Sequence, residues 1–161
     1  MEATPSTPAT PTGESDSPSE QPTPPVINIP ANLANAILRA YQNYWSVRVN
    51  ALNNPYDPTI DLASVMAGTE LETARQTVAH SRDAGETGVS NVHHQIWITS
   101  ASSQQAVVVD RYTAHGQRVM VDPTTQLPLP GDPVKEDESY ADRFLLQNID
   151  GVWKVVAEEP E

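Results

Sequence analysis

The chain has 161 residues, no cysteine and a formal net charge of −12, and its length suits one ordinary domain. Such acidity disfavours nucleic acids and anionic membrane surfaces as partners, because both repel a negative protein. Without cysteine the chain can form no disulfide, no thiol nucleophile and no zinc–thiolate site. No apolar run approaches the roughly 18 residues of a membrane span.

Residues 1–25 differ in composition from the rest of the chain. They are rich in Pro, Ser and Thr, contain no Lys or Arg, and include Glu2, Glu14, Asp16 and Glu20. Such a segment cannot bury enough apolar surface to offset its ordering entropy, so we expect it to be disordered. It is either a tether that holds a folded domain away from a surface or a dispensable tail.

The same segment resembles the stalk that follows the lipid-bearing cysteine of bacterial lipoproteins. The resemblance implies an extracytoplasmic protein, tethered in the cell envelope or secreted, although a cytoplasmic location stays open. In that case the protein meets a membrane only through an N-terminal anchor that has been removed from this sequence. The folded domain is expected over residues 26–157, followed by an acidic end at 158–161.

The stretch 31–52 is the one long segment with a clear helical period. Its apolar residues recur at steps of three and four, so they share one face of a helix. This stripe contains three large aromatic rings in a chain that is only 6% aromatic. It needs a broad apolar surface, which a curved sheet from the second half of the chain could supply. The stripe consists of Leu33, Ile37, Tyr41, Tyr44, Trp45, Val49 and Leu52.

Two shorter helices are expected next, over residues 59–66 and 69–83. The sequence Thr-Glu-Leu-Glu at the start of the second resembles a capping box, and Gly85 or Gly88 ends this helix. From residue 89 the apolar period changes to two, which is typical of strands. Antiparallel strands are expected over residues 89–99, 105–113, 118–122, 139–148 and 152–157, with a mostly irregular segment at 126–138.

Helices followed by a meander of strands are typical of an α+β fold. With the segments VVVDRY at 107–112 and DGVWKV at 150–155, this order resembles the nuclear transport factor 2-like superfamily, which includes ketosteroid isomerase and SnoaL-like proteins. The segment VMVDPTT at 119–125 also resembles a feature of bacterial envelope members. The resemblance implies a cone-like, curved antiparallel or mixed sheet wrapped around the long N-terminal helix, with two shorter helices.

In that superfamily a pocket lies at the wide end of the cone. Members use it for isomerisation, dehydration, epoxide hydrolysis or ligand binding, and others fill it with side chains and act as interaction domains. The resemblance therefore implies a fold and leaves the function open.

Asp110 interrupts a run of valines. If it faces the cone, apolar walls would raise its pKa and make it a candidate general base. If Thr99 pairs with Gln104 across the hairpin, His93 lies opposite Asp110 as an acid–base pair. This pair could equally be an outward charge pair, and a register slip of one residue abolishes it.

Aromatic residues complete the candidate ligand site. Tyr41, Tyr44 and Trp45 line a pocket for an apolar ligand or, as such stripes more often do, belong to the core. The resemblance to ketosteroid isomerase implies that Tyr41 or Tyr112 would assist Asp110. We assign no catalytic residue. The candidate ligand-binding residues are Tyr41, Trp45, His94, Asp110 and Tyr112.

No metal and no cofactor are expected. His93 and His94 are neighbours on a strand, so their side chains point to opposite faces and cannot share one metal ion. The sequence contains no HExxH motif, no phosphate-binding loop and no nucleophilic-serine motif.

Two functions remain open. The first is a non-catalytic accessory or interaction domain of a tethered, lipoprotein-like bacterial protein, with a protein partner. The second is a small-molecule-binding protein, or an isomerase- or dehydratase-like enzyme, that binds a small apolar ligand between the first helix and the sheet. A homodimer through the outer sheet face is a further hypothesis, which exposure of Trp97 or Trp153 would support.

Overall fold

The computed structural model of the protein describes residues 27–161. The segment 1–25, for which the sequence predicts disorder, lies outside these described residues. The chain forms helix α1, a 3-10 turn η1, helix α2 and four strands. Their bounds are α1 Ala31–Asn53, η1 Leu62–Ser64, α2 Gly68–Ala84, β1 Glu86–Ala101, β2 Gln105–Met120, β3 Val134–Ile149 and β4 Val152–Pro160.

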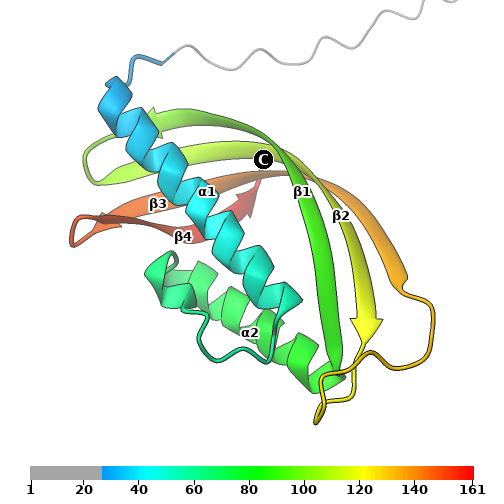
Figure 1. The fold of residues 1–161 in the computed structure, drawn as a ribbon. Coiled ribbons are helices and arrows are strands. Elements are labelled where there is room, and N and C mark those ends of the chain that lie inside the picture. The colour runs from blue at the N-terminus through cyan, green and yellow to red at the C-terminus, as the bar shows by residue number, and fades with distance from the viewer. Residues whose placement is uncertain (1–26) are drawn as a thin grey trace, which may run out of the picture.

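The four strands form one antiparallel sheet in the order β1-β2-β3-β4. The sheet is strongly curved, and both helices lie on its concave side (Figure 1). Helix α1 crosses the strands, and α2 lies below it toward β4 (Figure 1). This is the expected α+β fold, with a curved sheet wrapped around the long first helix.

One expected helix is absent from the described chain: residues 59–66 form only the short turn η1, Leu62–Ser64. The Asp61 side chain accepts a hydrogen bond from the Ala63 N–H and so starts this turn. The chain then leaves helical geometry because its backbone pairs with β4, where the Val155 N–H donates to the Val65 carbonyl at 3.1 Å. Tertiary pairing therefore outweighs the local helical preference.

The strands are longer than the sequence predicts. The separate strand expected at 118–122 is the end of β2, because the backbone from Gln105 to Arg118 pairs with β3 without a break. The irregular segment expected to last until residue 138 ends at Val134, where β3 begins. Strand β4 runs to Pro160 and takes in most of the expected acidic end.

The register between β1 and β2 also differs from the expected one. His94 lies opposite Tyr112 and Ile96 opposite Asp110, and His93 pairs with Thr113. The predicted pairing of His93 with Asp110 is therefore wrong, because the turn and an irregularity after Ile98 set a different register. His93 lies on the convex face, and His94 shares the concave face with Asp110.

Of the two predictions for the ends of α2, the one for its C-terminal end is confirmed and the one for its N-terminal end is wrong. The helix ends at Gly85, whose φ of 70° is the left-handed geometry that favours glycine. The expected capping box is not formed, because the Thr69 hydroxyl donates to the Val156 carbonyl at 3.1 Å. Gly68 has a φ of 58°, and a Cβ there would lie 3.0 Å from the same carbonyl oxygen, so the approach of α2 to β4 requires glycine.

The core lies between α1 and the concave face of the sheet. Ile37, Tyr41 and Tyr44 on α1 are fully buried against Phe144 of β3. The sequence-predicted stripe therefore does face the sheet.

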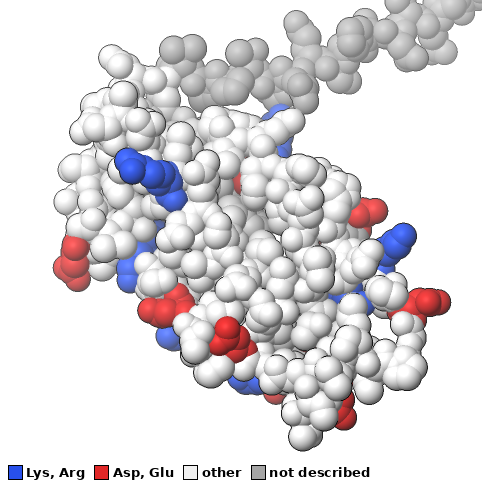
Figure 2. Space-filling view, in the orientation of Figure 1, with Lys and Arg blue, Asp and Glu red and all other residues white. Residues whose placement is uncertain are grey.

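Figure 2 shows the surface of the molecule in the orientation of Figure 1. Charged side chains of both signs lie around the edge of this view, and its centre is largely free of them. Among the described residues, neither helix combines the length and apolar character needed to cross a membrane.

Candidate functional site

The five residues that the sequence singles out lie together on the concave side of the sheet. The Tyr41 hydroxyl donates to Asp110 Oδ2 at 2.8 Å, and His94 Nδ1 lies 2.6 Å from the same oxygen. The Trp45 ring contacts both the His94 ring, at 4.9 Å between centroids, and the Tyr112 ring, at 4.8 Å. Three different elements, α1, β1 and β2, therefore contribute to one cluster.

The part of this cluster around Asp110 is closed to solvent. Asp110 and Tyr41 are both fully buried, and the Gln95 N–H donates to the second carboxylate oxygen at 3.2 Å. Phe144 fills the adjoining space, with its ring 5.0 Å from that of Tyr41. Burial raises the pKa of the Tyr41 phenol well above its usual range, so this group remains protonated. We call these residues, Tyr41, His94 and Asp110, the inner cluster.

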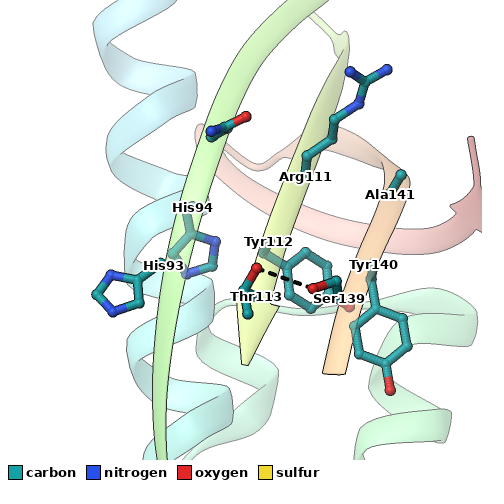
Figure 3. Close-up of a pocket in the computed structure, with 9 residues that line it drawn as sticks. His93, His94, Arg111, Tyr112, Thr113, Ser139, Tyr140 and Ala141 are labelled. Atoms are coloured by element: carbon teal, nitrogen blue, oxygen red, sulfur yellow. Dashed lines mark hydrogen bonds between the residues drawn. The ribbon is translucent and has the colours of Figure 1, made fainter. Parts of the chain in front are cut away.

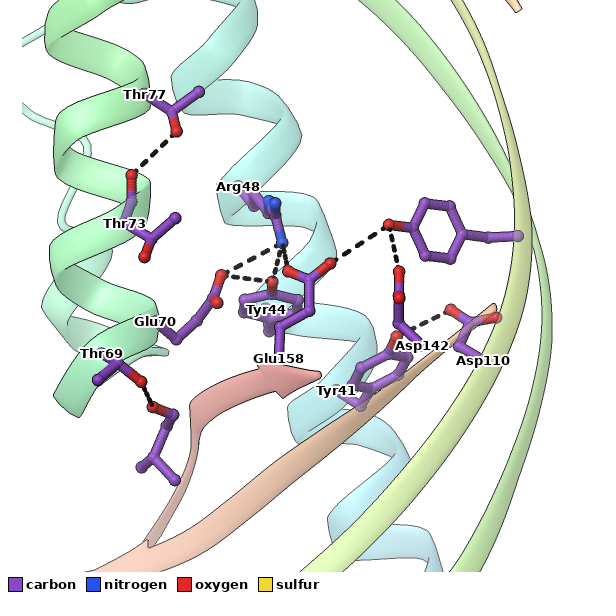
Figure 4. Close-up of polar contacts among 12 residues, drawn as sticks. Tyr41, Tyr44, Arg48, Thr69, Glu70, Thr73, Thr77, Asp110, Asp142 and Glu158 are labelled. Carbon is purple, nitrogen blue, oxygen red and sulfur yellow. Dashed lines mark hydrogen bonds and ion pairs between the residues drawn. The ribbon is translucent and has the colours of Figure 1, made fainter. Parts of the chain in front are cut away.

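A second polar cluster lies toward the C-terminal half of α1 (Figure 4). Arg48 donates to Glu158 Oε2 at 2.7 Å and to Glu70 Oε1 at 3.2 Å, and it also donates to the Tyr44 hydroxyl. The Tyr44 hydroxyl itself donates to Glu70 at 2.7 Å. The Arg48 guanidinium lies 5.2 Å from the centre of the Trp45 ring, within cation–π distance.

Glu70 is the buried acid of this second cluster, and its burial favours the protonated carboxyl. Glu70 is 3% exposed, and its burial raises the pKa of the carboxyl although the Arg48 charge opposes this shift. Burial also raises the pKa of the Tyr44 phenol above its usual range. The raised pKa values reflect the cost of placing charge among apolar side chains.

The chain of polar contacts continues to the sheet through Tyr112. Its hydroxyl lies 3.1 Å from Asp142 Oδ2 and 3.4 Å from Glu158 Oε1. Asp142 lies directly opposite Asp110 across β2 and β3, so two carboxylates share the concave face as neighbours. Burial raises the pKa of Asp142. We call Arg48, Tyr112, Asp142 and Glu158 the mouth cluster.

The mouth cluster borders an open cavity of about 530 Å³ at the wide end of the curved sheet. Trp45, Arg48 and Val49 of α1 form one wall, and Tyr112 and Asp142 of the sheet form another. The volume lies within the range of roughly 300–1,000 Å³ that is usual for ligand pockets. The cavity contains aromatic rings and carboxylates side by side, which is a binding surface with both apolar and negative character.

A second cavity, of about 340 Å³, opens between α1 and β1. His94 lines it, and 21% of the His94 side chain is exposed. Trp45, Val49 and Val92 line both this cavity and the mouth cavity. His94 therefore connects the sealed Asp110 carboxylate with solvent.

The convex face of the sheet has a shallow depression of about 540 Å³ (Figure 3). His93, Arg111 and Thr113 lie there, and the Thr113 and Ser139 hydroxyls are 3.2 Å apart. Trp97 is half-buried on this face, with the Arg111 guanidinium 5.3 Å from the centre of its ring. Trp153 is also half-buried, but it packs against the core. Exposure of a tryptophan therefore gives the dimer hypothesis little support.

Four residues of these clusters were not among the sequence-predicted candidates, namely Arg48, Glu70, Asp142 and Glu158. Arg48 had a usable signal, because it follows Tyr44 by four residues and Trp45 by three on the same helix. Asp142 and Glu158 gave no signal, since only the pairing of β2, β3 and β4 brings them together. No group of three or more His, Asp or Glu side chains within residues 27–161 is arranged to hold a metal ion.

Comparisons with known proteins support the fold alone. No protein-family model matches the chain, and no curated protein matches it in sequence. The structure is similar to the intermembrane space region of the chloroplast protein ARC6, with a TM-score of 0.55 and 16% identity over 76% of this chain and 94% of that one. This likeness supports the α+β fold with a curved sheet around a long first helix.

A second similar structure is a putative calcium/calmodulin dependent protein kinase II association domain from Xanthomonas campestris. Its TM-score is 0.43 and its identity 14%, over 76% of this chain and 82% of that chain. A likeness at this level is too distant to carry an argument about this protein.

Proposed function

We propose that the protein is a non-catalytic interaction domain that binds its partner through the mouth cavity. One observation carries this proposal: Asp110, the best candidate for a general base, is fully buried and its two oxygens accept hydrogen bonds or contacts from Tyr41, His94 and the Gln95 N–H. A carboxylate so enclosed cannot itself contact a substrate. The open cavity nearby offers a surface for binding.

A photo-crosslinking experiment in cells of the source organism tests this proposal. A photoreactive amino acid replaces Ser90, which lines the mouth cavity, or Ser139, which lies on the convex face. We expect an adduct with a different protein from position 90 and none with a different protein from position 139. An adduct from position 139 alone, or no adduct from either, contradicts binding through the mouth.

The setting that we propose is the bacterial cell envelope, with segment 1–25 as a tether and the folded domain outside the cytoplasm. The composition of that segment supports this setting, and the similar ARC6 region is itself an intermembrane-space region. Fractionation of source cells with an antibody against the folded domain checks it. Recovery with the envelope is expected, and recovery in the cytosol contradicts the proposal.

An acid–base enzyme of the isomerase or dehydratase type is the second candidate. Asp142 favours it, because this carboxyl lines the cavity, has a raised pKa and accepts from Tyr112. A carboxyl whose pKa is raised by its surroundings is typical of an acid–base site. Turnover of small carbonyl compounds that is abolished by Asp142→Asn would establish this function in place of the first.

A homodimer through the convex face of the sheet remains a separate proposal. The half-buried Trp97 and the depression around Thr113 would lie in such an interface. Sedimentation of the protein over a hundredfold range of concentration decides the question. A monomer at the highest concentration rules the dimer out.

A further inference from the structure

The mouth cavity carries more negative than positive charge. Four of the described residues that line it have acidic or basic side chains. Arg48 is the basic one, and Glu138, Asp142 and Glu158 are acidic. The Arg48 charge is already shared between Glu158, at 2.7 Å, and Glu70, at 3.2 Å behind it. Glu138 and Asp142 accept from neutral tyrosine hydroxyls, Tyr140 and Tyr112 respectively. Glu138 therefore attracts a further cation, and Asp142 does so in its ionised form.

The walls of the same cavity are aromatic. The Tyr112 and Tyr140 rings stack with centroids 5.1 Å apart, and the Trp45 ring meets Tyr112 edge-on at 4.8 Å. Tyr140 is 43% exposed, so its ring is accessible at the cavity rim. A cation held near aromatic rings gains cation–π stabilisation in addition to its attraction to carboxylates.

The protein itself shows that this environment accepts a guanidinium. Arg48 lies 5.7 Å from the centre of the Tyr44 ring and 5.2 Å from that of Trp45, and two carboxylates surround it. The groups around Tyr112, Asp142 and Glu138 repeat this combination of rings and carboxylates on the sheet side of the cavity. There the structure supplies no cation from the described chain apart from Arg48.

We infer that the mouth cavity binds an organic cation, either the ammonium or guanidinium group of a partner's Lys or Arg side chain or a free amine. The inference rests on the proposed binding role of this cavity and names the chemistry that it selects. A volume of about 530 Å³ admits such a group with its alkyl stem. A metal ion fits less well, because no described group of acids and histidines has ligand geometry and the walls are aromatic.

Titration of the ¹⁵N-labelled full chain with blocked peptides tests the inference. The probes are N-acetyl-Gly-Arg-Gly-amide and the same peptide with neutral citrulline in place of arginine. The chain has three tryptophans, and their indole N–H signals report on separate places. We expect the arginine peptide to shift the Trp45 signal but not those of Trp97 and Trp153. Equal shifts with the citrulline peptide, or no shift with the arginine peptide and with free amines, overturn the inference.

Agmatine and tetramethylammonium separate the two sources of the cation. If agmatine binds as tightly as the arginine peptide, a free amine is sufficient, and if only the peptide binds, the cation belongs to a partner's side chain. Either result supports an organic cation as the ligand. Binding should weaken as ionic strength rises, because screening reduces the attraction between opposite charges.

Matched variants locate the binding charge. Glu138 faces the mouth cavity, and its neighbour Asp137 points to the convex face and pairs with His115 at 2.9 Å. We expect Glu138→Gln to weaken arginine-peptide binding by roughly fivefold, and Asp137→Asn, with the same change in net charge, to leave it unchanged. Equal weakening by both variants would mean non-specific attraction and would overturn the inference.

The two proposals can fail separately. A crosslinked partner at position 90 together with no binding of any cationic probe would reject the organic cation and retain the interaction domain. Absence of both results would reject the two together. Asp142→Asn provides a second test of whether carboxylate charge in the mouth cavity binds the cation. The far-ultraviolet circular dichroism of this variant checks that it is folded.

Discussion

The inner cluster and the mouth cluster contain the same chemical pair in two different surroundings. Tyr41 donates to Asp110 at 2.8 Å, and Tyr112 donates to Asp142 at 3.1 Å. The two aspartates are direct neighbours across β2 and β3. Asp110 is fully buried, whereas Asp142 is 9% exposed and borders a cavity.

The difference between the clusters follows from what covers each one. Phe144 and the aromatic residues of α1 close the space around Asp110, so the carboxylate itself has no contact with solvent. At the mouth the same types of group face an open cavity between α1 and the sheet. Residue type therefore does not distinguish a fully enclosed carboxylate from one that borders a cavity, and the surrounding structure does.

The largest expected effect is alkaline unfolding, which tests how well the phenols are enclosed. Burial raises the pKa of Tyr41, Tyr44 and Tyr112 above the value of about 10 in an unfolded chain. The folded state then retains protons that the unfolded state releases. Stability is fully present below pH ~10 and falls above it, by about 4 kcal/mol at pH ~11 if all three phenols remain protonated.

Absorbance near 295 nm and circular dichroism, recorded together during the titration, measure this effect. The three phenols should ionise in the same pH range in which the fold is lost. Ionisation of these tyrosines in the folded protein near pH ~10 would mean that they are open to solvent and would break the comparison.

Asp110→Ala is expected to give the next largest effect. The substitution leaves the Tyr41 hydroxyl, the His94 ring and the Gln95 N–H without their buried acceptor. We expect a loss of about 3 kcal/mol in the free energy of unfolding, measured with urea. The exposed Asp137→Ala serves as control and should change stability by less than about 0.5 kcal/mol. Similar costs for both would mean that Asp110 is not enclosed.

The same chemical change at the two tyrosines sharpens the comparison further. Tyr41→Phe leaves a fully buried carboxylate with one donor fewer, and we expect it to cost about 2 kcal/mol. Tyr112→Phe removes a hydroxyl beside the cavity, where water can replace it, and should cost about 0.5 kcal/mol. Urea unfolding of the two variants measures the difference. Equal costs would show that the mouth is as dry as the interior.

The smallest expected effect is a change in pH dependence on Glu70→Gln. Because burial raises the folded-state pKa of Glu70, the native state binds more protons than the unfolded state above pH ~4.3. The stabilisation of the fold that Glu70 contributes through this proton is fully present below that pH. It is lost as the pH rises through the raised pKa of Glu70. Relative to Glu70→Gln, the wild-type free energy of unfolding should therefore fall over this window.

Urea unfolding at a series of pH values gives the Glu70 effect as a difference between the two proteins. This difference removes the contributions of Asp57 and Asp122, whose pKa values are lowered by hydrogen bonds and act in the opposite direction. A wild-type stability that rises relative to the variant over the same window would mean that Arg48 outweighs burial at Glu70.

By itself the sequence determined those helices and turns whose residue pattern lies within one short stretch of the chain. The stripe from Ile37 to Trp45 predicts α1 and the face that it buries, because helical spacing fixes which side chains align. Gly85 predicts the end of α2, and Asp150-Gly151 predicts the last hairpin. The same patterns grouped Tyr41, Trp45, His94, Asp110 and Tyr112 as candidates but left open which face of each strand lies inside.

Only the tertiary structure decided the register, the enclosure and the charge of the site. The β1–β2 pairing places His94 rather than His93 on the face of Asp110, and a shift of one residue exchanges the two faces. Arg48, Asp142 and Glu158 meet because three elements distant in sequence converge. Such contacts depend on long-range packing, which no local pattern encodes, so the sequence predicted the fold class but not which carboxylate faces the cavity.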